Sequence, residues 1–484
     1  MIRSALQRLA NGTVIYGVGG VLQKFMGLLL LPFYTRVLTT EDYGVVSLIS
    51  LFGVAMNGFL TLGTGNSMGY LYFREEDRAK RPIIIWTNLF LLAGNGIFWF
   101  SLVWLFAPAI SSFVFRTNQY GNLIYLAVLT NVLISISDPW RSYLRMEEKA
   151  KQFVFVTLFS SLLTIGLSIL LVLFLNAGVF GLILAGTLAQ LISLVFMWFI
   201  VGRKLPFGVD KKLISPLIRI GFPSTFGIFA FLVIDYADRH MIERMLGLSE
   251  LGIYSTGYSF GMIMTILMGA FATAWPPFFM SYVNKQAEAG RIFGRVMTYY
   301  TLGFGSLIVL VFFAAKPLVM SMTAATFHES WVVVGLVATG FALKGWYLIT
   351  LPGISFARKL HWQSIIEWIA AISNIGLNFW LIPIYGILGA AMATAISYLT
   401  LPVVAWLVSR KFLTVLYQWD RLALSSTAVA TASGLIFYFS GSYVGWSYYG
   451  LISNFIVVLA FFAFCYSTLL SDRERAMIKD KLGV

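Results

Sequence analysis

Charged side chains interrupt several long apolar runs of this 484-residue chain, and each of these charges needs a partner or water. Lys24 is the only formally charged residue between Val14 and Tyr34, and Lys344 lies within the run VGLVATGFALKGWYLI. Because an ammonium group is costly to bury in hydrocarbon, we expect both lysines to face protein or a wet cavity. Two lysines in one cavity would attract an anionic ligand, such as a phosphate-linked headgroup.

Acidic side chains form a second set of candidates. Asp235 and Asp238 lie three residues apart and share one face of a helix, and Arg239 follows Asp235 by four residues, which permits an intrahelical ion pair. Glu367 falls early in a later apolar run. These carboxylates are either boundary charges satisfied by water and by each other, or functional groups that couple to protons or sodium or that orient an arginine in a cavity. The sequence leaves both interpretations open.

Two arginines follow a proline at the end of another apolar run. Pro139 cannot donate a backbone hydrogen bond, so it is expected to kink or end the helix just before Arg141 and Arg145. The arginines are either an ordinary boundary on the cytoplasmic side of a membrane or a cytoplasmic mouth that receives an anionic headgroup.

Common enzymatic and metal-binding motifs are missing from the sequence. It contains no GxxxxGK[ST] nucleotide-binding loop, no HExxH and no CxxC. Cys465 is the only cysteine, which excludes an intramolecular disulfide, and His240 and His328 have no ligand-like spacing. We therefore expect a protein that is not an enzyme and that carries no cofactor or metal.

The composition is that of a membrane protein. Hydrophobic residues make up 59% of the chain and charged residues 11%, with a mean hydropathy of +0.83. About fourteen runs are long enough to span a bilayer, so the predicted fold is an all-α polytopic bundle. Most of the 34 Lys and Arg residues lie in alternate connections, which places both termini in the cytoplasm. This topology accounts for the net charge of +14 without a nucleic-acid partner.

Two pairs of similar segments indicate an internal repeat. RVLTTEDYG, at residues 36–44, resembles RMLGLSELG, at residues 244–252. GVFGLILAG, which begins at Gly178, resembles GILGAAMAT, which begins at Gly386. Both pairs are separated by 208 positions, which shared apolar composition alone would rarely produce.

The repeat predicts the domain organisation. A unit of six membrane helices occurs twice, and because six is even, both copies share one orientation and are related by a pseudo-twofold axis along the membrane normal. We assign residues 1–201 to an N-lobe, 202–215 to a cytoplasmic linker and 216–412 to a C-lobe. Two further helices and a cytoplasmic tail occupy residues 413–484.

The order of four segments points to a known family. These segments are RVLTTEDYGVVSL, RMLGLSELGIYSTGY, AWPPFF and IPIYGILGAAMATAIS. With them, nearly the whole chain resembles the polysaccharide-transporter branch of the MOP flippase superfamily, which includes the Wzx-type flippases of lipid-linked oligosaccharides.

The resemblance implies a function. Proteins of this family have two six-helix lobes around a central cavity and work by alternating access. They move undecaprenyl-diphosphate-linked oligosaccharides from the cytoplasmic to the periplasmic leaflet of the bacterial inner membrane, for O-antigen (lipopolysaccharide), capsule or exopolysaccharide synthesis. The cavities of the family are often cationic, which suits Lys24 and Lys344, and we predict that these lysines bind the substrate. We also expect a monomer surrounded by membrane lipids, and the family implies that a polymerase and a chain-length regulator act nearby.

One departure from a related family concerns the substrate. The similar peptidoglycan lipid flippases carry several arginines in the first two spans. Here the mid-span position holds Lys24, and the second span has no arginine, which argues against lipid II as the substrate.

Two other functions compete with the flippase. A multidrug or cation antiporter of the same superfamily would prefer a negatively charged cavity, lined by Asp235, Asp238 and Glu367 rather than by the lysines. An O-antigen polymerase would need a long periplasmic loop with catalytic residues, and the outer loops of this sequence are short.

Overall fold

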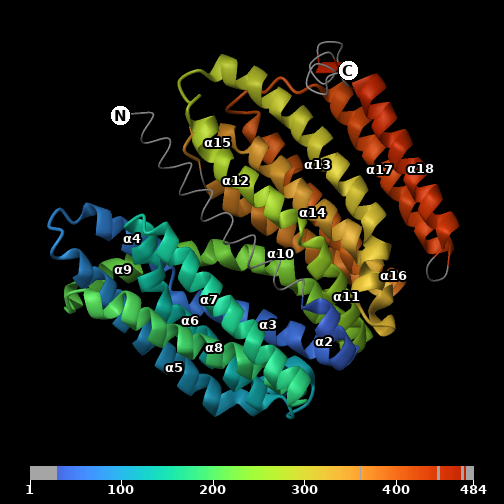
Figure 1. Cartoon of the computed structure of the whole chain (residues 1–484). Helices are drawn as coiled ribbons and strands as arrows, with labels where there is room; N and C mark the ends of the chain where they lie inside the picture. The colour runs from blue at the N-terminus through green and yellow to red at the C-terminus, as the bar shows by residue number, and fades with distance from the viewer. Residues whose placement is uncertain (1–29, 360, 444–446, 470–473, 476–484) are drawn as a thin grey trace. The chain divides into compact units, whose positions relative to one another are not determined.

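The computed structural model describes residues 30–359, 361–443, 447–469 and 474–475, and all regular structure in these ranges is helical (Figure 1). The prediction of an all-α fold is confirmed. The chain divides into two compact units, Met1–Gly252 and Ile253–Val484. This division lies beyond the predicted linker, since α9 and α10 pack with the first unit. The lobe boundaries assigned from the repeat therefore remain a prediction.

The first unit is built from long helices joined by short connections. Its described elements are α2 (Leu31–Val37), α3 (Thr40–Thr61), α4 (Thr64–Arg74), α5 (Arg81–Phe115), α6 (Gly121–Met146), α7 (Ala150–Ser168) with the π-helical turn η1 (Ile169–Phe174), α8 (Gly178–Ile200), the short turns η2 (Gly202–Lys204) and η3 (Lys211–Leu213), α9 (Ile214–Gly221), α10 (Pro223–Leu246) and the start of α11 (Leu248–Gly261).

The second unit begins within α11 and is also built from long helices joined by short connections. Its described elements are α12 (Met264–Met280), α13 (Gln286–Met322), the turn η4 (Ala325–Ser330), α14 (Trp331–Thr350), α15 (Pro352–Phe356), α16 (His361–Ser409), α17 (Trp419–Ser442), α18 (Tyr448–Phe464) and the π-helical turn η5 (Cys465–Leu469).

Among the described residues, ten helices are long and apolar enough to cross a membrane, or eleven if the bent pair α11 and α12 forms one span. The difference from the expected fourteen has identifiable sources. The first expected span lies largely in residues 1–29, outside the described part, and α16 contains two expected spans within one element. Every 18-residue window of α10 contains Asp235, Asp238 and Arg239, which exceeds the charge allowed for a span. The count of fourteen remains a prediction.

The glycines of the second repeated segment pair turn the chain in the same way. Gly178 and Gly386 both have positive φ, +54° and +58°, a conformation that glycine adopts without steric cost. At Gly386 the long α16 is interrupted by non-helical backbone and divides into two helices. A Cβ at Gly389 would overlap the Leu381 carbonyl, which shows how closely the two halves pack. These matching turns support the repeat.

Two helices extend beyond charged residues near their ends. Pro139 does not end its helix, because α6 continues through it to Met146. After Asp238, α10 continues to Leu246 and ends at Gly247, whose φ is +97°. Both helices therefore carry charged residues on an ordered helical turn beyond the expected end of the span.

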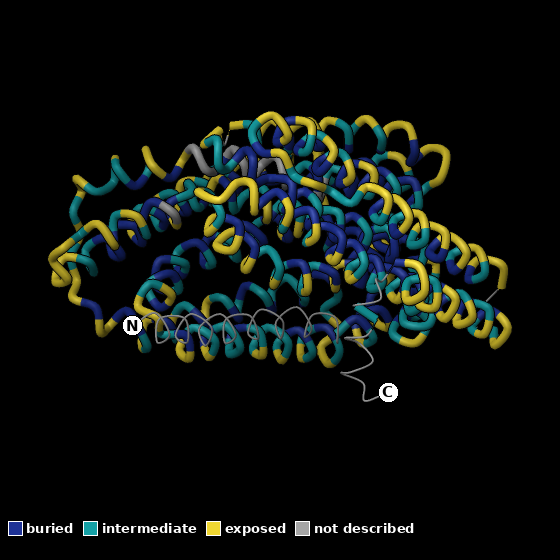
Figure 2. Tube along the Cα trace, turned by 90° about the horizontal axis from the view of Figure 1, so that it is seen from above, coloured by how far each residue is buried: buried dark blue, intermediate teal, exposed yellow. Residues whose placement is uncertain are grey.

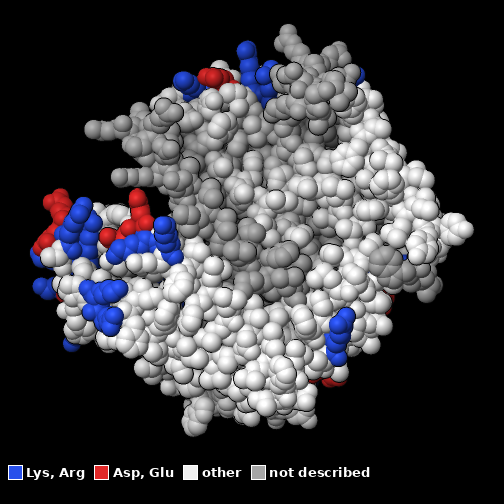
Figure 3. Space-filling view, viewed as in Figure 1, with Lys and Arg blue, Asp and Glu red and all other residues white. Residues whose placement is uncertain are grey.

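The outward faces of the helices are apolar. Large side chains such as Phe98, Trp104 and Leu105 on α5 are more than half exposed, as expected for surfaces that contact lipid. Buried and exposed residues alternate along the helices (Figure 2). On the face shown in Figure 3, charged side chains gather beside α4 and at a few points on the rim, and the described surface between them is uncharged.

Candidate functional site

Lys344 lies in a polar cluster inside the second unit. It is partly buried on α14, with its ammonium 6.0 Å from the ring centroid of the fully buried Tyr398 on α16. Lys344 also interacts electrostatically with Glu367 on α16, whose carboxylate accepts a hydrogen bond of 3.0 Å from the hydroxyl of Tyr347. The cluster therefore joins a lysine and a carboxylate that the sequence assigned to competing functions.

Arg141 lies in a second polar cluster, within the first unit. Its Nη2 donates to Oε1 of Gln190 on α8 at 3.3 Å, and Nε2 of Gln190 donates to the hydroxyl of Ser160 on α7 at 3.4 Å. Nε of Arg141 is buried and makes no hydrogen bond to protein. Three helices thus hold a guanidinium that retains a donor for a further acceptor.

Arg145, one turn further along α6, is more exposed. Its Nη2 lies 3.9 Å from Oδ1 of Asp138 and donates to the hydroxyl of Ser142 at 2.6 Å, while its guanidinium lies 5.5 Å from the ring centroid of Phe153. Asp138 is therefore close to Arg145 on the same helix. The structure brings the two predicted arginines to one end of α6, with different partners.

The remaining predicted residues divide between described and undescribed positions. Asp238 is fully buried on α10, and its Oδ1 lies 3.7 Å from Nη1 of Arg239, so an ion pair joins these neighbours. Asp235 lies on the same helix, but its side chain is outside the described part of the structure. Lys24 also falls outside the described residues. Among the described residues, no group of three His, Cys, Asp or Glu side chains could hold a metal ion.

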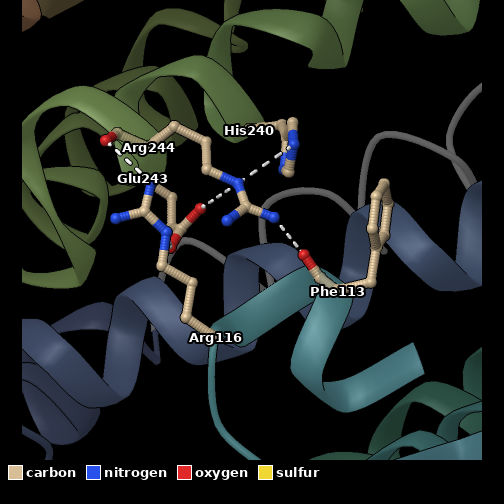
Figure 4. A network of polar contacts seen from close by, with 5 residues as sticks. All are labelled: Phe113, Arg116, His240, Glu243 and Arg244. Carbon is tan, nitrogen blue, oxygen red and sulfur yellow. Dashed lines mark hydrogen bonds and ion pairs between the residues drawn. The ribbon is translucent and has the colours of Figure 1, made fainter. Parts of the chain in front are cut away.

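A third network, which the sequence did not predict, joins α10 to the end of α5 (Figure 4). Glu243 is 6% exposed, with Oε2 3.4 Å from Nε of Arg244 and Oε1 4.0 Å from Nε of Arg116. Arg244 donates to the carbonyl of Phe113 and to Nε2 of His240 at 3.4 Å. Arg116 donates to the Arg244 carbonyl at 3.2 Å, and the rings of Phe113 and His240 stack.

Partial burial shifts the pKa values of two groups in this network. Burial raises the pKa of the Glu243 carboxyl, and the positive charges of Arg244 and Arg116 oppose this shift. Burial also lowers the pKa of His240, and the same two arginines lower it further. Desolvation of the Glu243 carboxylate thus outweighs the effect of the two arginines on its pKa.

Sequence reasoning missed two kinds of residue. Gln190 could have been found, because a lone amide in an apolar run needs a partner just as Lys24 does. The pairing of Glu243 with Arg116 had no local signal, since 127 positions separate the two residues. The buried amides of Asn374 and Asn378 on α16, each with an unpaired polar atom, were also overlooked.

Comparison with known proteins places the chain in a family. Residues 33–334, well over half of the sequence, match the model of a family described as polysaccharide biosynthesis protein. The chain belongs to this family. It is a multi-pass membrane protein of the polysaccharide biosynthesis type.

Two curated relatives are proteins of Haemophilus influenzae. The Lsg locus putative protein 1 is 24% identical over 289 residues, which cover 57% of this chain and 66% of that protein, slightly less than two thirds of its length. A protein described as an uncharacterized membrane protein is 20% identical over 423 residues, covering 85% of this chain and 96% of that protein.

The fold is similar to that of two solved membrane proteins. The lipid II flippase MurJ in an inward closed conformation matches with a TM-score of 0.70 and 15% identity, covering 96% of this chain and all of that chain. An inward-facing multidrug resistance MATE transporter of the MOP superfamily matches with a TM-score of 0.66 and 15% identity, covering 84% of this chain and 96% of that chain.

Proposed function

We propose that this chain is a flippase that moves polyprenyl-diphosphate-linked oligosaccharide repeat units from the cytoplasmic to the periplasmic leaflet of the bacterial inner membrane. The observation that carries the proposal is the match to a polysaccharide biosynthesis family over residues 33–334. The MOP-type fold supports transport across a membrane, and the cations inside the bundle suit an anionic headgroup.

Two cationic groups would bind the diphosphate at different stages. Arg141 and Arg145 lie at the end of α6 that the topology places on the cytoplasmic side, and the unpaired Nε–H of Arg141 would donate a hydrogen bond to a diphosphate oxygen. Lys344 would contact the diphosphate or acidic sugars further inside, with Lys24 as a second contact. The polyprenyl chain would remain in the bilayer while the two lobes rock, which requires no catalytic residue.

The apolar chain of the substrate would find suitable surfaces on the second unit. A cavity of about 560 Å³ between α13, α14, α16 and α17 is lined almost entirely by apolar side chains, including Phe304, Ile308 and Leu343. Hydrocarbon entering this cavity would lose no polar contacts.

The coupling ion and the partners belong to the same proposal. Asp238 and Glu367, with Asp235, are the candidate groups for coupling to protons or sodium, because ionisable side chains within membrane helices commonly mark proton and ion pathways. Both termini would lie in the cytoplasm, and a polymerase and a chain-length regulator would consume the translocated repeat units.

A multidrug or cation antiporter is the second candidate. The structural likeness to a MATE transporter and the carboxylates Asp238 and Glu367 favour it. The cluster around Lys344 contains both a lysine and a carboxylate. Its charge therefore favours neither the flippase nor the antiporter.

Deletion of the gene in its host tests the proposal. We expect loss of one surface polysaccharide and accumulation of its lipid-linked repeat unit in the cytoplasmic leaflet, measured by the accessibility of the glycan to an external lectin or glycosidase. A plasmid copy should restore both. An intact set of surface glycans, with new sensitivity to cationic drugs, would favour the antiporter.

A further inference from the structure

A polar pocket lies in the first unit, where α4 leads into α5 and α6 leads into α7. Its volume is about 350 Å³, and its lining combines aromatic rings with charges of both signs. Figure 3 shows charged side chains of both signs gathered beside α4. We call it the α4–α6 pocket, and its polar lining residues are Tyr72, Arg78, Arg81, Tyr143, Glu147 and Glu148.

One wall of the α4–α6 pocket is fixed by side chains that bind each other. Tyr72 is 2% exposed, and its hydroxyl donates to Oε1 of Glu147 at 2.6 Å. The guanidinium of Arg81 lies 5.2 Å from the ring centroid of Tyr72, and its Nε donates to the carbonyl of Glu75 at 3.0 Å. These contacts tie the end of α6 to α4 and to the start of α5, so the pocket is formed before a ligand binds.

Two charged side chains of the lining retain all their hydrogen-bonding groups. The side chains of Arg78 and Glu148 make no hydrogen bond or ion pair with the described part of the chain. The turn that carries Arg78 is held locally, since Oδ1 of Asp77 accepts from the backbone N–H of Ala79 at 3.0 Å. Glu148 has a φ of +54°, and its backbone N–H donates to the carbonyl of Arg145 at 3.1 Å. Ordered backbone thus places one free guanidinium and one free carboxylate at the pocket.

The lining matches a ligand that is rich in hydroxyl groups. Two arginines and two glutamates balance each other, so an anionic group would be attracted by one pair and repelled by the other. A hydroxyl group accepts from a guanidinium and donates to a carboxylate, so it can use both kinds of side chain. Phe73, which also lines the pocket, is 64% exposed, and its ring can pack against the C–H groups on one face of a sugar. The volume lies near the lower end of the range for small-molecule sites, which suits a short piece of glycan.

The α4–α6 pocket is separate from the arginine cluster described above. Tyr143 follows Arg141 by two residues, and since each residue turns an α-helix by about 100°, their side chains lie on opposite sides of α6. Arg141 donates to Gln190 on α8, whereas the Tyr143 ring packs against Tyr72 on α4, with centroids 6.4 Å apart. A ligand in the pocket therefore leaves Arg141 free for another group.

We propose that the α4–α6 pocket binds uncharged sugars of the lipid-linked repeat unit at the cytoplasmic surface, before the diphosphate reaches Arg141. The inference rests on the proposed function, which supplies the glycan and places the connections after α4 and after α6 in the cytoplasm. Contacts to the diphosphate alone do not distinguish one glycan from another. A sugar site at the entrance would therefore let the protein select its own repeat unit among polyprenyl-diphosphate lipids.

Removal of the two free charges tests the inference. The variant R78Q/E148Q removes one positive and one negative charge, so the net charge of the chain is unchanged. The matched control is E76Q/K151Q, because Glu76 and Lys151 are also exposed, lie on or beside the same two connections and do not line the pocket. A second variant, F73A, removes the exposed ring and leaves the hydrogen bond between Tyr72 and Glu147 in place.

Binding is measured on the purified full-length protein in detergent. The probe is the free oligosaccharide that mild acid releases from the lipid-linked intermediate of the deletion strain, titrated by saturation-transfer NMR. Its dissociation constant should rise about tenfold or more in R78Q/E148Q and in F73A, because a hydrogen bond to a charged group or a packed ring is lost. The control should bind as the wild type does. Equal affinity in all four proteins, or no binding by the wild type, would overturn the inference.

Translocation separates the inference from the function on which it rests. In vesicles that contain the complete lipid-linked repeat unit, R78Q/E148Q should raise the half-saturating lipid concentration and leave the maximal rate unchanged, as loss of a capture site predicts. An unchanged half-saturating concentration would refute the inference and leave the proposed function standing. No translocation by the wild type would refute the proposed function itself.

A lipid headgroup is the other occupant that the experiment must distinguish. Phosphatidylglycerol that copurifies with the wild type is quantified by mass spectrometry and compared with the amount bound to R78Q/E148Q. Loss of this lipid from the variant, with unchanged affinity for the oligosaccharide, would make the pocket an anionic headgroup site and contradict the inference. Equal amounts of lipid, with weaker oligosaccharide binding by the variant, would support the sugar site.

Discussion

At the scale of single residues, the chain keeps its intramembrane charges by surrounding them with polar partners from neighbouring helices. Lys344 has Glu367 and the ring of Tyr398 close by, and Arg141 donates to Gln190. A charge held in this way retains donors for an anionic ligand while avoiding the cost of isolation in hydrocarbon. The sequence predicted that Lys344 needs a partner, but it did not predict that the partner is Glu367.

Removing the charge of Lys344 should impair transport. A hydrogen bond to a charged group contributes about 1.5–3 kcal/mol, so Lys344→Met should reduce translocation roughly ten- to a hundredfold, whereas Lys344→Arg should retain most of it. Lys359→Met is the matched control, because this exposed lysine lies 4.9 Å from the ring centroid of Phe412 near a connection between helices. Surface polysaccharide in the complemented deletion strain is the readout, with protein amount in the membrane measured in parallel. Equal complementation by the Met variant and the wild type would exclude Lys344 as a substrate contact.

At the scale of the elements, the repeat is visible in both sequence and backbone. The offset of 208 positions predicted equivalent segments, and the structure gives Gly178 and Gly386 the same positive φ. A proline was a less reliable indicator of where a helix ends. Pro139 was expected to kink or end a helix that in fact continues, because the other backbone hydrogen bonds and the packing of α6 against α5 and α8 maintain it.

Contacts between distant segments could not be predicted in the same way. Nothing near Glu243 in the sequence indicates Arg116, because the pairing depends on how α10 packs in three dimensions. The contact of Gly44 with Leu248 likewise needed the fold, although both residues belong to the repeated segments that the sequence revealed. Composition and repeats therefore predicted the class of fold and the candidate charges, while their partners required the structure.

The two turning glycines should be needed for stability in equivalent ways. A side chain in a sparsely populated conformation with positive φ costs about 1–3 kcal/mol, so Gly178→Ala and Gly386→Ala should each lower the midpoint of thermal unfolding in detergent. Gly166→Ala and Gly376→Ala are the controls, since both glycines lie in helices and an added Cβ would meet nothing within 4 Å. Those substitutions should leave the midpoint unchanged or raise it. Unchanged midpoints for both turning glycines would show that the positive φ values are not structurally required.

At the scale of the whole molecule, the chain is a multi-pass membrane protein of a polysaccharide biosynthesis family, with a fold similar to that of the solved MurJ and MATE structures. Apolar outer faces suit lipid, and charged clusters lie within and at the ends of the helices. Together these features support the movement of an amphiphile whose polar headgroup crosses the protein while its chain stays in lipid.

The most direct test of the central claim is translocation by the purified protein. The protein is reconstituted into vesicles that contain a short-chain polyprenyl diphosphate bearing the host's repeat unit, and the fraction of glycan protected from an external glycosidase is followed with time. We predict that the protein accelerates exchange of this lipid between leaflets, and that protein-free vesicles and vesicles with Lys344→Met do so far more slowly. No acceleration of the lipid-linked glycan, together with uptake of a cationic dye driven by an ion gradient, would contradict the flippase and identify an antiporter.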